Sequence, residues 1–304
     1  MLYHLTVCKS AGSVYKLLIP DEDGPQALRI EGGANQISSR LVEEVGADRV
    51  ELHRAVSRIE VDEANGVTRV HYHSTDDSDN KGAYVCSQVI SAIPPNQCAR
   101  IDFLPALPYL KRRAFEAGIP GNAIKFIITY ETAFWREEGF SGEVISSGRT
   151  AKPGEMLPVI CTYDYCTPSG MPALVGLISE EYADLSRGDR CNVVVQDLMR
   201  FFGNQAMLQF VDYQEKDWSL DTFGGGGPGV VMPCGTMNSW QTLREPFLSI
   251  HFAGAETASH WIGYMDGAVE SGLRAAHEVL QQLGHYEKVS YTILVCFWFI
   301  LVIL

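Results

Sequence analysis

The sequence lacks the features of a nucleic-acid-binding or zinc-binding protein. It has no dense run of lysine and arginine, and its 24 basic residues against 37 acidic ones give a net charge of −13. This balance argues against a phosphate backbone as the main partner. None of its eight cysteines forms a C-x-x-C pair, and no cysteine and histidine cluster has zinc-ligand spacing, so we expect no metal site. The scattered thiols indicate a reduced, intracellular protein.

The first residues also lack a targeting signal. Residues 1–18 contain no basic segment followed by a continuous apolar stretch and a cleavage site, so we predict no signal peptide. No glycine-rich nucleotide-binding turn occurs near this end either. The 304 residues are 46% hydrophobic and 20% charged, which indicates a packed globular core of two domains or one large one.

One long hydrophobic run is present, at residues 289–304, with no charge after Lys288. A membrane-spanning helix takes about 20 apolar residues, and Tyr291 and Trp298 are of the types found near a membrane interface. We interpret residues 286–304 as a hydrophobic tail whose part 289–304 contacts or anchors in a membrane. The alternatives are a buried apolar strand or an artefact of reading frame or splicing.

The order of periodic segments predicts an α/β fold of the mixed, α+β kind. Ile37, Leu41, Val42 and Val45 recur at helical spacing, and Gly46 ends that helix. Strand-like runs follow until two prolines stop the last one. Residues from about 103 to 214 then have a different character, with a helix near 109–117, three further strands and a helical stretch. We interpret this part as a module inserted into the first.

After a run of four glycines, residues 249–284 have the pattern strand, small-residue turn, acidic residue and helix. The helix begins near Gly263 or Tyr264, and Gly284 ends it. Its apolar positions recur at the i, i+3, i+4 spacing of one face: Met265, Ala268, Val269, Gly272, Leu273 and Ala276. A helix N-terminus suits an electron-rich ligand atom. A tightly packed structural helix explains the same pattern equally well.

Read with its neighbours, this segment resembles the flavin-containing monoamine oxidases. The stretch FAGAETASHWIGYMDGAVESGLRAA is close to the flavin-binding signature of that family, and the resemblance extends from about residue 3 to residue 284. It also includes VISAIPP, FWR and the pair Asp217-Trp218. The resemblance implies part of an FAD-binding domain, of the FAD/NAD(P)-binding two-domain amine oxidase type, with an inserted substrate-domain sheet.

The resemblance also implies domain boundaries along the chain. Residues 1–23 would end an incomplete substrate domain, and residues 24–104 would form part of the FAD-binding domain. The substrate domain would continue over residues 105–215. Residues 216–285 would complete the FAD-binding part, before the tail.

The site residues are likewise implied by the resemblance. Lys125 matches the family lysine that holds a water near the flavin, and Tyr264 matches one tyrosine of an aromatic cage for the amine. Val175 and Leu177, with Tyr264, match substrate positions. The cofactor positions that the family would supply are Val56, Trp218, Glu256, Gly263, Tyr264, Met265 and Ala268.

Three positions or segments depart from the family pattern. Gly227 replaces the cysteine to which the family usually attaches FAD, so we expect FAD to be bound non-covalently. Pro228 replaces the second cage tyrosine, which leaves one aromatic wall of the kind that recognises cations. No strand, G-x-G-x-x-G turn and helix occur in that order. We therefore expect a fragment or truncated relative that purifies colourless by itself.

The family reaction gives the functional hypotheses. The first is a flavin-dependent amine oxidase that deaminates primary or secondary amines with O₂, giving an aldehyde, H₂O₂ and an amine or ammonia. The second is a non-catalytic remnant or a membrane-tethered interaction protein, and the third is a polyamine oxidase-like flavoenzyme. The expected partners are a small amine and O₂, with no nucleic acid. The family location suggests the mitochondrial outer membrane.

Overall fold

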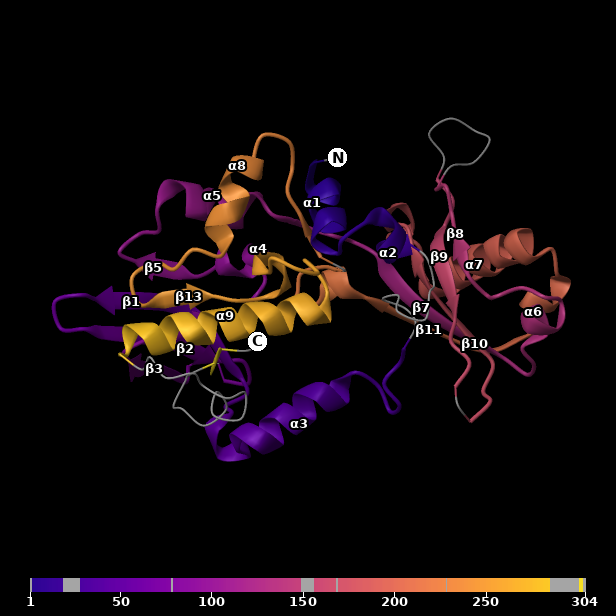
Figure 1. The fold of residues 1–304 in the computed structure, drawn as a ribbon. Helices are drawn as coiled ribbons and strands as arrows, with labels where there is room; N and C mark the ends of the chain where they lie inside the picture. Colours follow the sequence, from indigo (N-terminus) through magenta and orange to yellow (C-terminus); the bar gives the residue numbers. More distant parts are fainter. Residues whose placement is uncertain are drawn as a thin grey trace. The chain divides into compact units, whose positions relative to one another are not determined.

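The chain folds into two compact units in the computed structural model, which describes residues 2–18, 28–77, 79–148, 156–167, 169–227, 229–284 and 301–302 (Figure 1). Unit 1 consists of Met1–Ile119 and Gly229–Leu304, and unit 2 is the continuous segment Pro120–Pro228. The mixed α/β fold class predicted from the sequence is confirmed.

Unit 1 contains two larger sheets. The first has the order β3-β2-β1-β5, in which β1 is antiparallel to β2 and parallel to β5, and the second has the order β13-β4-β14, with both neighbours parallel to β4. Its strands are β1 (Arg54–Asp62), β2 (Val67–Ser74), β3 (Lys81–Cys86), β4 (Val89–Ser91), β5 (Asp102–Leu104), β12 (Val230–Val231), β13 (Ile250–Phe252) and β14 (Leu301–Val302). The short strand β6 (Ile119–Pro120) pairs with β12.

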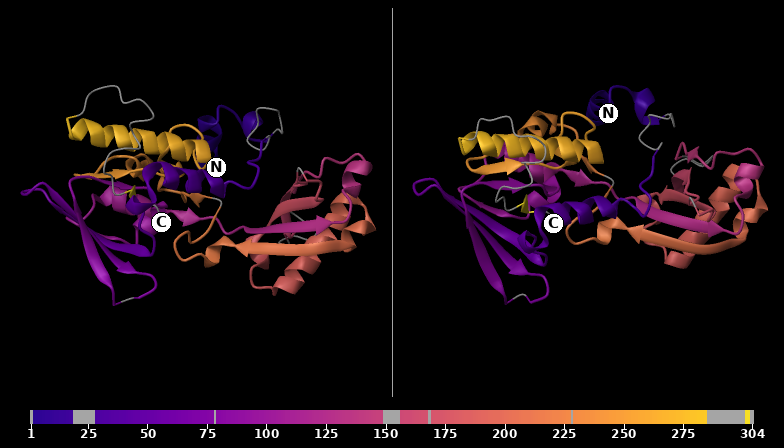
Figure 2. Two further views of the ribbon diagram at one scale, coloured as in Figure 1. Left: turned by 90° about the horizontal axis from the view of Figure 1, so that it is seen from below. Right: turned by 60° about the horizontal axis from the view of Figure 1, so that its bottom comes forward.

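Helices cover these sheets. Figure 2 shows the longest, α9, and the β1–β2–β3 strands on opposite sides of unit 1. Ala275 and Val279 of α9 pack against Ile90 of β4 and Ala253 after β13. The helices of unit 1 are α1 (Leu2–Ser10), α2 (Val14–Leu18), α3 (Asn35–Val45), η1 (Ala47–Arg49), α4 (Pro95–Cys98), α5 (Tyr109–Ala117), α8 (Met237–Trp240), η5 (Gln241–Leu243), η6 (Ala255–Thr257) and α9 (Met265–Gln282).

The predicted helix before the first sheet is confirmed as α3, which ends at Gly46. None of its residues is buried, however, and Leu41 is 53% exposed. The apolar stripe that made this helix predictable therefore has no cover within the described residues.

Unit 2 is built on a five-stranded antiparallel sheet with the order β11-β7-β10-β9-β8. Ile124, Phe126, Ile128 and Tyr130 alternate along β7 and are buried, since a strand turns successive side chains to opposite faces. Helix α7 contributes Val194, Val195, Leu198 and Phe202 to the same core. The elements are β7 (Ile124–Tyr130), α6 (Phe134–Glu137), β8 (Val144–Ile145), β9 (Val159–Asp164), β10 (Ala173–Ile178), η2 (Glu180–Tyr182), α7 (Arg187–Phe202), η3 (Gln205–Leu208), β11 (Phe210–Asp217) and η4 (Trp218–Leu220).

The boundaries of unit 2 differ from the 105–215 expected for the inserted module. Helix α5 lies in unit 1 because Ala114 and Phe115 belong to its core. The glycine-rich segment lies in unit 2 because the Gly227 N–H donates to the Gly121 carbonyl at 2.7 Å. Helix α1, expected to end a substrate domain, also lies in unit 1, where the Ile262 N–H donates to Ser10 Oγ at 3.1 Å.

An ion pair anchors the FWR motif to the sheet of unit 2. Arg136 donates to both carboxylate oxygens of Asp164, at 2.6 and 2.8 Å, and the Trp135 indole donates to the same group at 2.9 Å. Burial alone raises the pKa of Asp164, but these donors outweigh it and hold that pKa well below its ordinary value. The contribution of this carboxylate to stability is therefore present at neutral pH and is lost in strong acid.

Most of the hydrophobic tail, residues 285–300 with 303 and 304, lies outside the described residues. Leu301 and Val302 form β14, opposite Ile90 and Ser91 of β4. In the described part of the chain, no helix combines the length and the hydropathy needed to cross a bilayer.

Candidate functional site

Five of the predicted site residues lie in one strand–turn–helix of unit 1. Strand β13 leads into η6, which contains Glu256, and Tyr264 is the residue directly before α9. The Gly263 N–H donates to the Ala255 carbonyl at 3.1 Å and closes this turn. Gly263 has φ +83°, a backbone conformation that favours glycine. Met265 and Ala268 follow in the first turn of α9.

The face that α9 buries is not the apolar face read from the sequence. Its buried residues are Gly267, Ser271, Ala275, Val279 and Leu280, whereas Met265 and Val269 are 56% and 60% exposed. Small residues occupy the buried side because the helix lies close to the preceding turn. The apolar side, which includes the predicted cofactor positions Met265 and Ala268, remains open in unit 1.

Glu256 has the environment of a functional carboxyl. Burial raises its pKa, and among the described residues the only hydrogen bond that acts on the carboxyl comes from its own backbone. Burial also raises the pKa of Tyr264, whose ring packs edge-to-face on Trp261 with centroids 5.4 Å apart. A carboxyl that receives no hydrogen bond from another described residue is suited to accept one from a ligand hydroxyl or N–H.

In unit 2, Lys125, Val175 and Leu177 share the sheet face opposite α7. Lys125 pairs directly with Leu177 across β7 and β10, and Val175 lies two residues from Leu177 on the same face. Lys125 is exposed, because its apolar neighbours Ile124 and Phe126 point to the α7 side. The register thus brings the predicted lysine and both predicted substrate positions together.

The structure adds Lys216, which sequence reasoning missed. It lies opposite Lys125 on β11, and its Nζ lies 5.3 Å from the ring centroid of Trp218. Strand periodicity could have found it, since Lys216 precedes Trp218 by two residues and so shares its side of the chain. Trp218 itself is 45% exposed. Two cations and an aromatic ring therefore lie along one edge of this sheet.

Gly227, the position of the missing attachment cysteine, lies beside Trp218. A Cβ added to Gly227 would be 3.8 Å from Trp218 Cβ, an ordinary contact distance. The letters from Gly224 to Gly229 have the spacing G-x-G-x-x-G. They stand between η4 and β12, however, and not between a strand and a helix, so they do not form a dinucleotide-binding turn.

Val56 lies on β1, on a different sheet of unit 1 from the strand–turn–helix. It is half-buried, and the pairing of β1 with β2 is irregular between Val56 and Arg58. Such an irregularity leaves backbone groups without a regular ladder partner. This fits the backbone contact to the cofactor that the resemblance implies for this residue.

The fit of a flavin to unit 1 can be tested on the start of α9. Strands β4 and β13 are parallel, and ligands of open α/β sheets bind outside the carboxyl ends of such strands. Helix α9 begins without a side-chain cap, so its positive end is available to an electron-rich group. Together with the Glu256 carboxyl and the open side of α9, these features fit the flavin part of FAD.

Comparisons with known proteins identify the family of the chain. The family described as flavin containing amine oxidoreductase matches residues 3–280. Amine oxidase [flavin-containing] A of Canis lupus familiaris is 35% identical over 93% of this chain, and the human B enzyme is 33% identical over the same share. The chain therefore belongs to the flavin-containing amine oxidoreductases.

Solved structures give the same result. Cyclohexylamine oxidase from Brevibacterium oxydans has a TM-score of 0.79 and 26% identity, over 93% of this chain and 60% of that one. A putrescine oxidase bound to putrescine has a TM-score of 0.78 and 29% identity, over 91% and 59%. The chain spans about half the length of its curated relatives, 52% for the canine enzyme.

Proposed function

We propose that the chain is the part of an FAD-dependent amine oxidase that carries the amine-facing sheet and the flavin end of the cofactor site. The reaction is the oxidative deamination of a primary or secondary amine with O₂, which gives an aldehyde, H₂O₂ and the released amine or ammonia. The observation that carries this proposal is the direct pairing of Lys125 with Leu177, beside Val175, on the sheet face opposite α7. This face combines two lysines, Lys125 and Lys216, with apolar side chains that suit the carbon skeleton of a small organic amine.

The chemistry supplied by bound FAD is the acceptance of two electrons from the amine and their transfer to O₂. The residues of the chain would position the cofactor and stabilise the charge that develops during the reaction. Lys125 would hold a water and provide positive charge where negative charge develops. Glu256 and the start of α9 would orient the cofactor, with Gly263, Tyr264, Met265 and Ala268 along the same turn. Trp218 would border the ring, and Val56 would contact the adenine part through its backbone.

Tyr264 is the one aromatic residue that we assign to amine recognition. With Pro228 in the place of its partner, cation recognition loses one ring, which contributes about 0.5–2 kcal/mol. A putrescine oxidase is among the structural neighbours, and this supports a polyamine as the second candidate substrate class. Comparing benzylamine with putrescine at equal concentrations separates the two candidates.

The proposed function is tested by the Lys125→Met variant. Because the described part of the chain contains no strand–GxGxxG–helix segment, the assay uses the chain joined to the amino-terminal part of canine amine oxidase A, beside the chain alone with added FAD. We expect the rate of O₂ reduction to fall about 10²–10³-fold, the loss typical of one electrostatic stabiliser. Stopped-flow absorbance of the flavin measures this rate separately from reduction by the amine.

Thr129→Val is the matched control, since Thr129 lies on the same strand and the same face. It should leave both rates at the level of the unmodified protein. If neither preparation binds FAD or produces H₂O₂ from an amine, the proposed function is wrong.

Attachment of the cofactor gives a second expected result. We propose that FAD is held non-covalently, because Gly227 has no side chain to bond with it. In Gly227→Cys the thiol can form a thioether with the flavin, with loss of the thiol hydrogen and one flavin hydrogen and transfer of the two electrons to O₂. The flavin should then stay with the denatured polypeptide, since the added Cβ fits beside Trp218. Acid precipitation followed by absorbance of the pellet measures retention. Flavin retained by the unmodified protein, or equal release from both, would contradict this.

For the tail, we propose membrane association at the mitochondrial outer membrane. Fusion of residues 286–304 to a soluble fluorescent protein should move it to the membrane fraction, because the run 289–304 is apolar and uncharged. The matched control is the same fusion with Val295→Lys, which places a charge near the middle of the run and should leave the reporter in the supernatant. An unmodified fusion that stays wholly in the supernatant overturns this assignment.

A further inference from the structure

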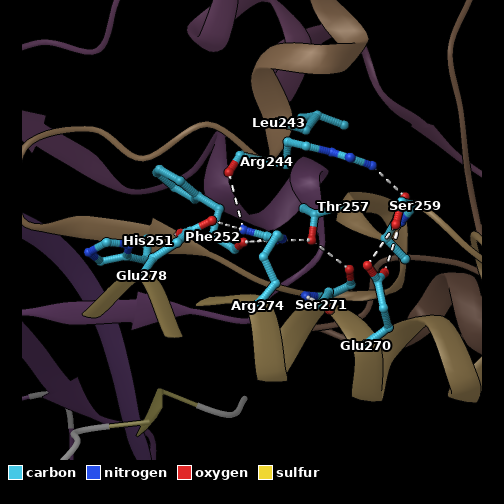
Figure 3. Close-up of polar contacts among 12 residues, drawn as sticks. Leu243, Arg244, His251, Phe252, Thr257, Ser259, Glu270, Ser271, Arg274 and Glu278 are labelled. Atoms are coloured by element: carbon cyan, nitrogen blue, oxygen red, sulfur yellow. Dashed lines mark hydrogen bonds and ion pairs between the residues drawn. The ribbon is translucent and has the colours of Figure 1, made fainter. Parts of the chain in front are cut away.

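A row of polar side chains joins α9 to the strand and turn that precede it (Figure 3). Glu270 accepts hydrogen bonds from Ser259 N and Oγ at 2.8 and 2.7 Å, and Ser271 Oγ accepts one from the Gly254 N–H at 3.0 Å. Further along, Glu278 lies 2.9 Å from Nδ1 of the buried His251. The helix is therefore bonded through Glu270, Ser271, Arg274 and Glu278 to residues between 251 and 259.

Arg274 is the centre of this row. Its Nη2 donates to the Phe252 carbonyl at 2.6 Å and to Thr257 Oγ1 at 3.1 Å, and its Nη1 donates to Glu278 at 2.7 Å and to the Arg244 carbonyl at 3.4 Å. One guanidinium therefore ties the end of β13, the end of η6 and the residue after η5 to the helix. A planar group with several fixed donors can do this, whereas an ammonium group cannot reach all of these acceptors at once.

The held residues bracket Glu256. Gly254 is fixed by Ser271 and Thr257 by Arg274, while the Glu256 carboxyl has no donor from another described residue. The position of the Glu256 carboxyl is therefore set by Gly254 and Thr257, which lie on either side of it in the sequence. The residues of α9 that hold Gly254 and Thr257 lie on the buried side of the helix. None of them is a predicted flavin-binding position.

We propose that Arg274 is a positioning residue that holds the turn from Gly254 to Thr257, and with it the Glu256 carboxyl, in the geometry that the cofactor meets. The link to the cofactor rests on the proposed function; the hold on the turn does not. Because hydrogen bonds to charged groups are stronger than neutral ones, loss of this one side chain releases the Phe252 carbonyl before the turn and Thr257 at its end, while Gly254 stays bonded to Ser271.

The test is amide hydrogen exchange of the 304-residue chain in three variants, Arg274→Met, Arg274→Lys and Arg112→Met. Arg112 is the control because it forms an exposed ion pair with Glu116 on α5. In Arg274→Met we expect exchange over residues 252–259 to accelerate about 10- to 100-fold, with exchange in β1–β3 unchanged. Arg274→Lys should restore part of the protection, since it keeps one charged donor.

A uniform rise in exchange across unit 1 would overturn the proposal, because it would mean a general role in stability. Unchanged exchange over residues 252–259 would overturn it as well. In the fusion with the canine amino-terminal part, FAD affinity should fall about 10-fold in Arg274→Met, and unchanged affinity with faster exchange would overturn the link to the cofactor. A fusion that binds no FAD even with Arg274 present contradicts the proposed function, and the exchange result then decides the hold on the turn by itself.

Discussion

Gly267→Ala is expected to destabilise unit 1 by about 1–3 kcal/mol, the range measured when extra volume is forced into a close contact. A Cβ at this position would lie 2.2 Å from the Trp261 carbonyl oxygen and 2.9 Å from that of His260. Both atoms are backbone, so neither can turn away. Relief requires α9 to move from the turn that carries Glu256, and we therefore expect weaker flavin binding in the same variant.

Gly272→Ala on the same helix is the matched control. Nothing lies within 4 Å of a Cβ there, so the substitution should stabilise the helix by about 0.5–1 kcal/mol through the higher helix propensity of alanine. Urea unfolding of the two variants measures both free energies. If the two variants changed the free energy of unfolding by the same amount, the close approach at Gly267 would not contribute to stability.

Lys111→Met is expected to change how the stability of unit 1 depends on pH. Lys111 is 3% exposed, its Nζ donates to the carbonyls of Thr242 and Leu243, and it lies 4.1 Å from the Phe252 ring centroid. Burial lowers the pKa of its amine from 10.5 to about 8. Between these two pH values the unfolded chain keeps the proton and the folded chain has lost it, so the free energy of unfolding rises with pH.

The size of this effect follows from the pKa difference. Comparing the two proteins at pH 8 and pH 10.5, the original chain should gain about 3 kcal/mol relative to Lys111→Met. Cys98 interacts electrostatically with Lys111, so both proteins carry Cys98→Ala and the difference between them reports Lys111. Lys81→Met, at an exposed position on β3, is the control and should show no relative gain. A difference between the two proteins that stays constant with pH would falsify this account of Lys111.

The sequence predicted the elements of this fold where periodicity and terminal signals agreed. The helix ending at Gly46 and the strand followed by a helix near Tyr264 are both present. The start of the inserted module was harder to predict, since it depends on which core receives Ala114 and Phe115. Packing between residues far apart in the chain decides this boundary. The hydrophobic periodicity of a single segment carries no information about such packing.

The orientation of the helix at the candidate site was not predicted. Hydrophobic periodicity placed Met265 and Val269 on one apolar face of α9, yet the buried face contains Gly267, Ser271 and Ala275. A helix that touches backbone needs small residues on the contact side, and these carry little hydrophobic signal. Lys216 was missed for a related reason, because its position opposite Lys125 depends on strand register.

The two ends of unit 2 meet. Asn122 and Gly227 form an isolated β-bridge, with the Gly227 N–H on the Gly121 carbonyl at 2.7 Å and the Ala123 N–H on the Gly227 carbonyl at 3.3 Å. A continuous segment with its own core and adjacent ends has the features of an inserted domain. Residues 120–228 can therefore be exchanged or redesigned in one piece, while the strand–turn–helix that contains Glu256 and Tyr264 stays unchanged.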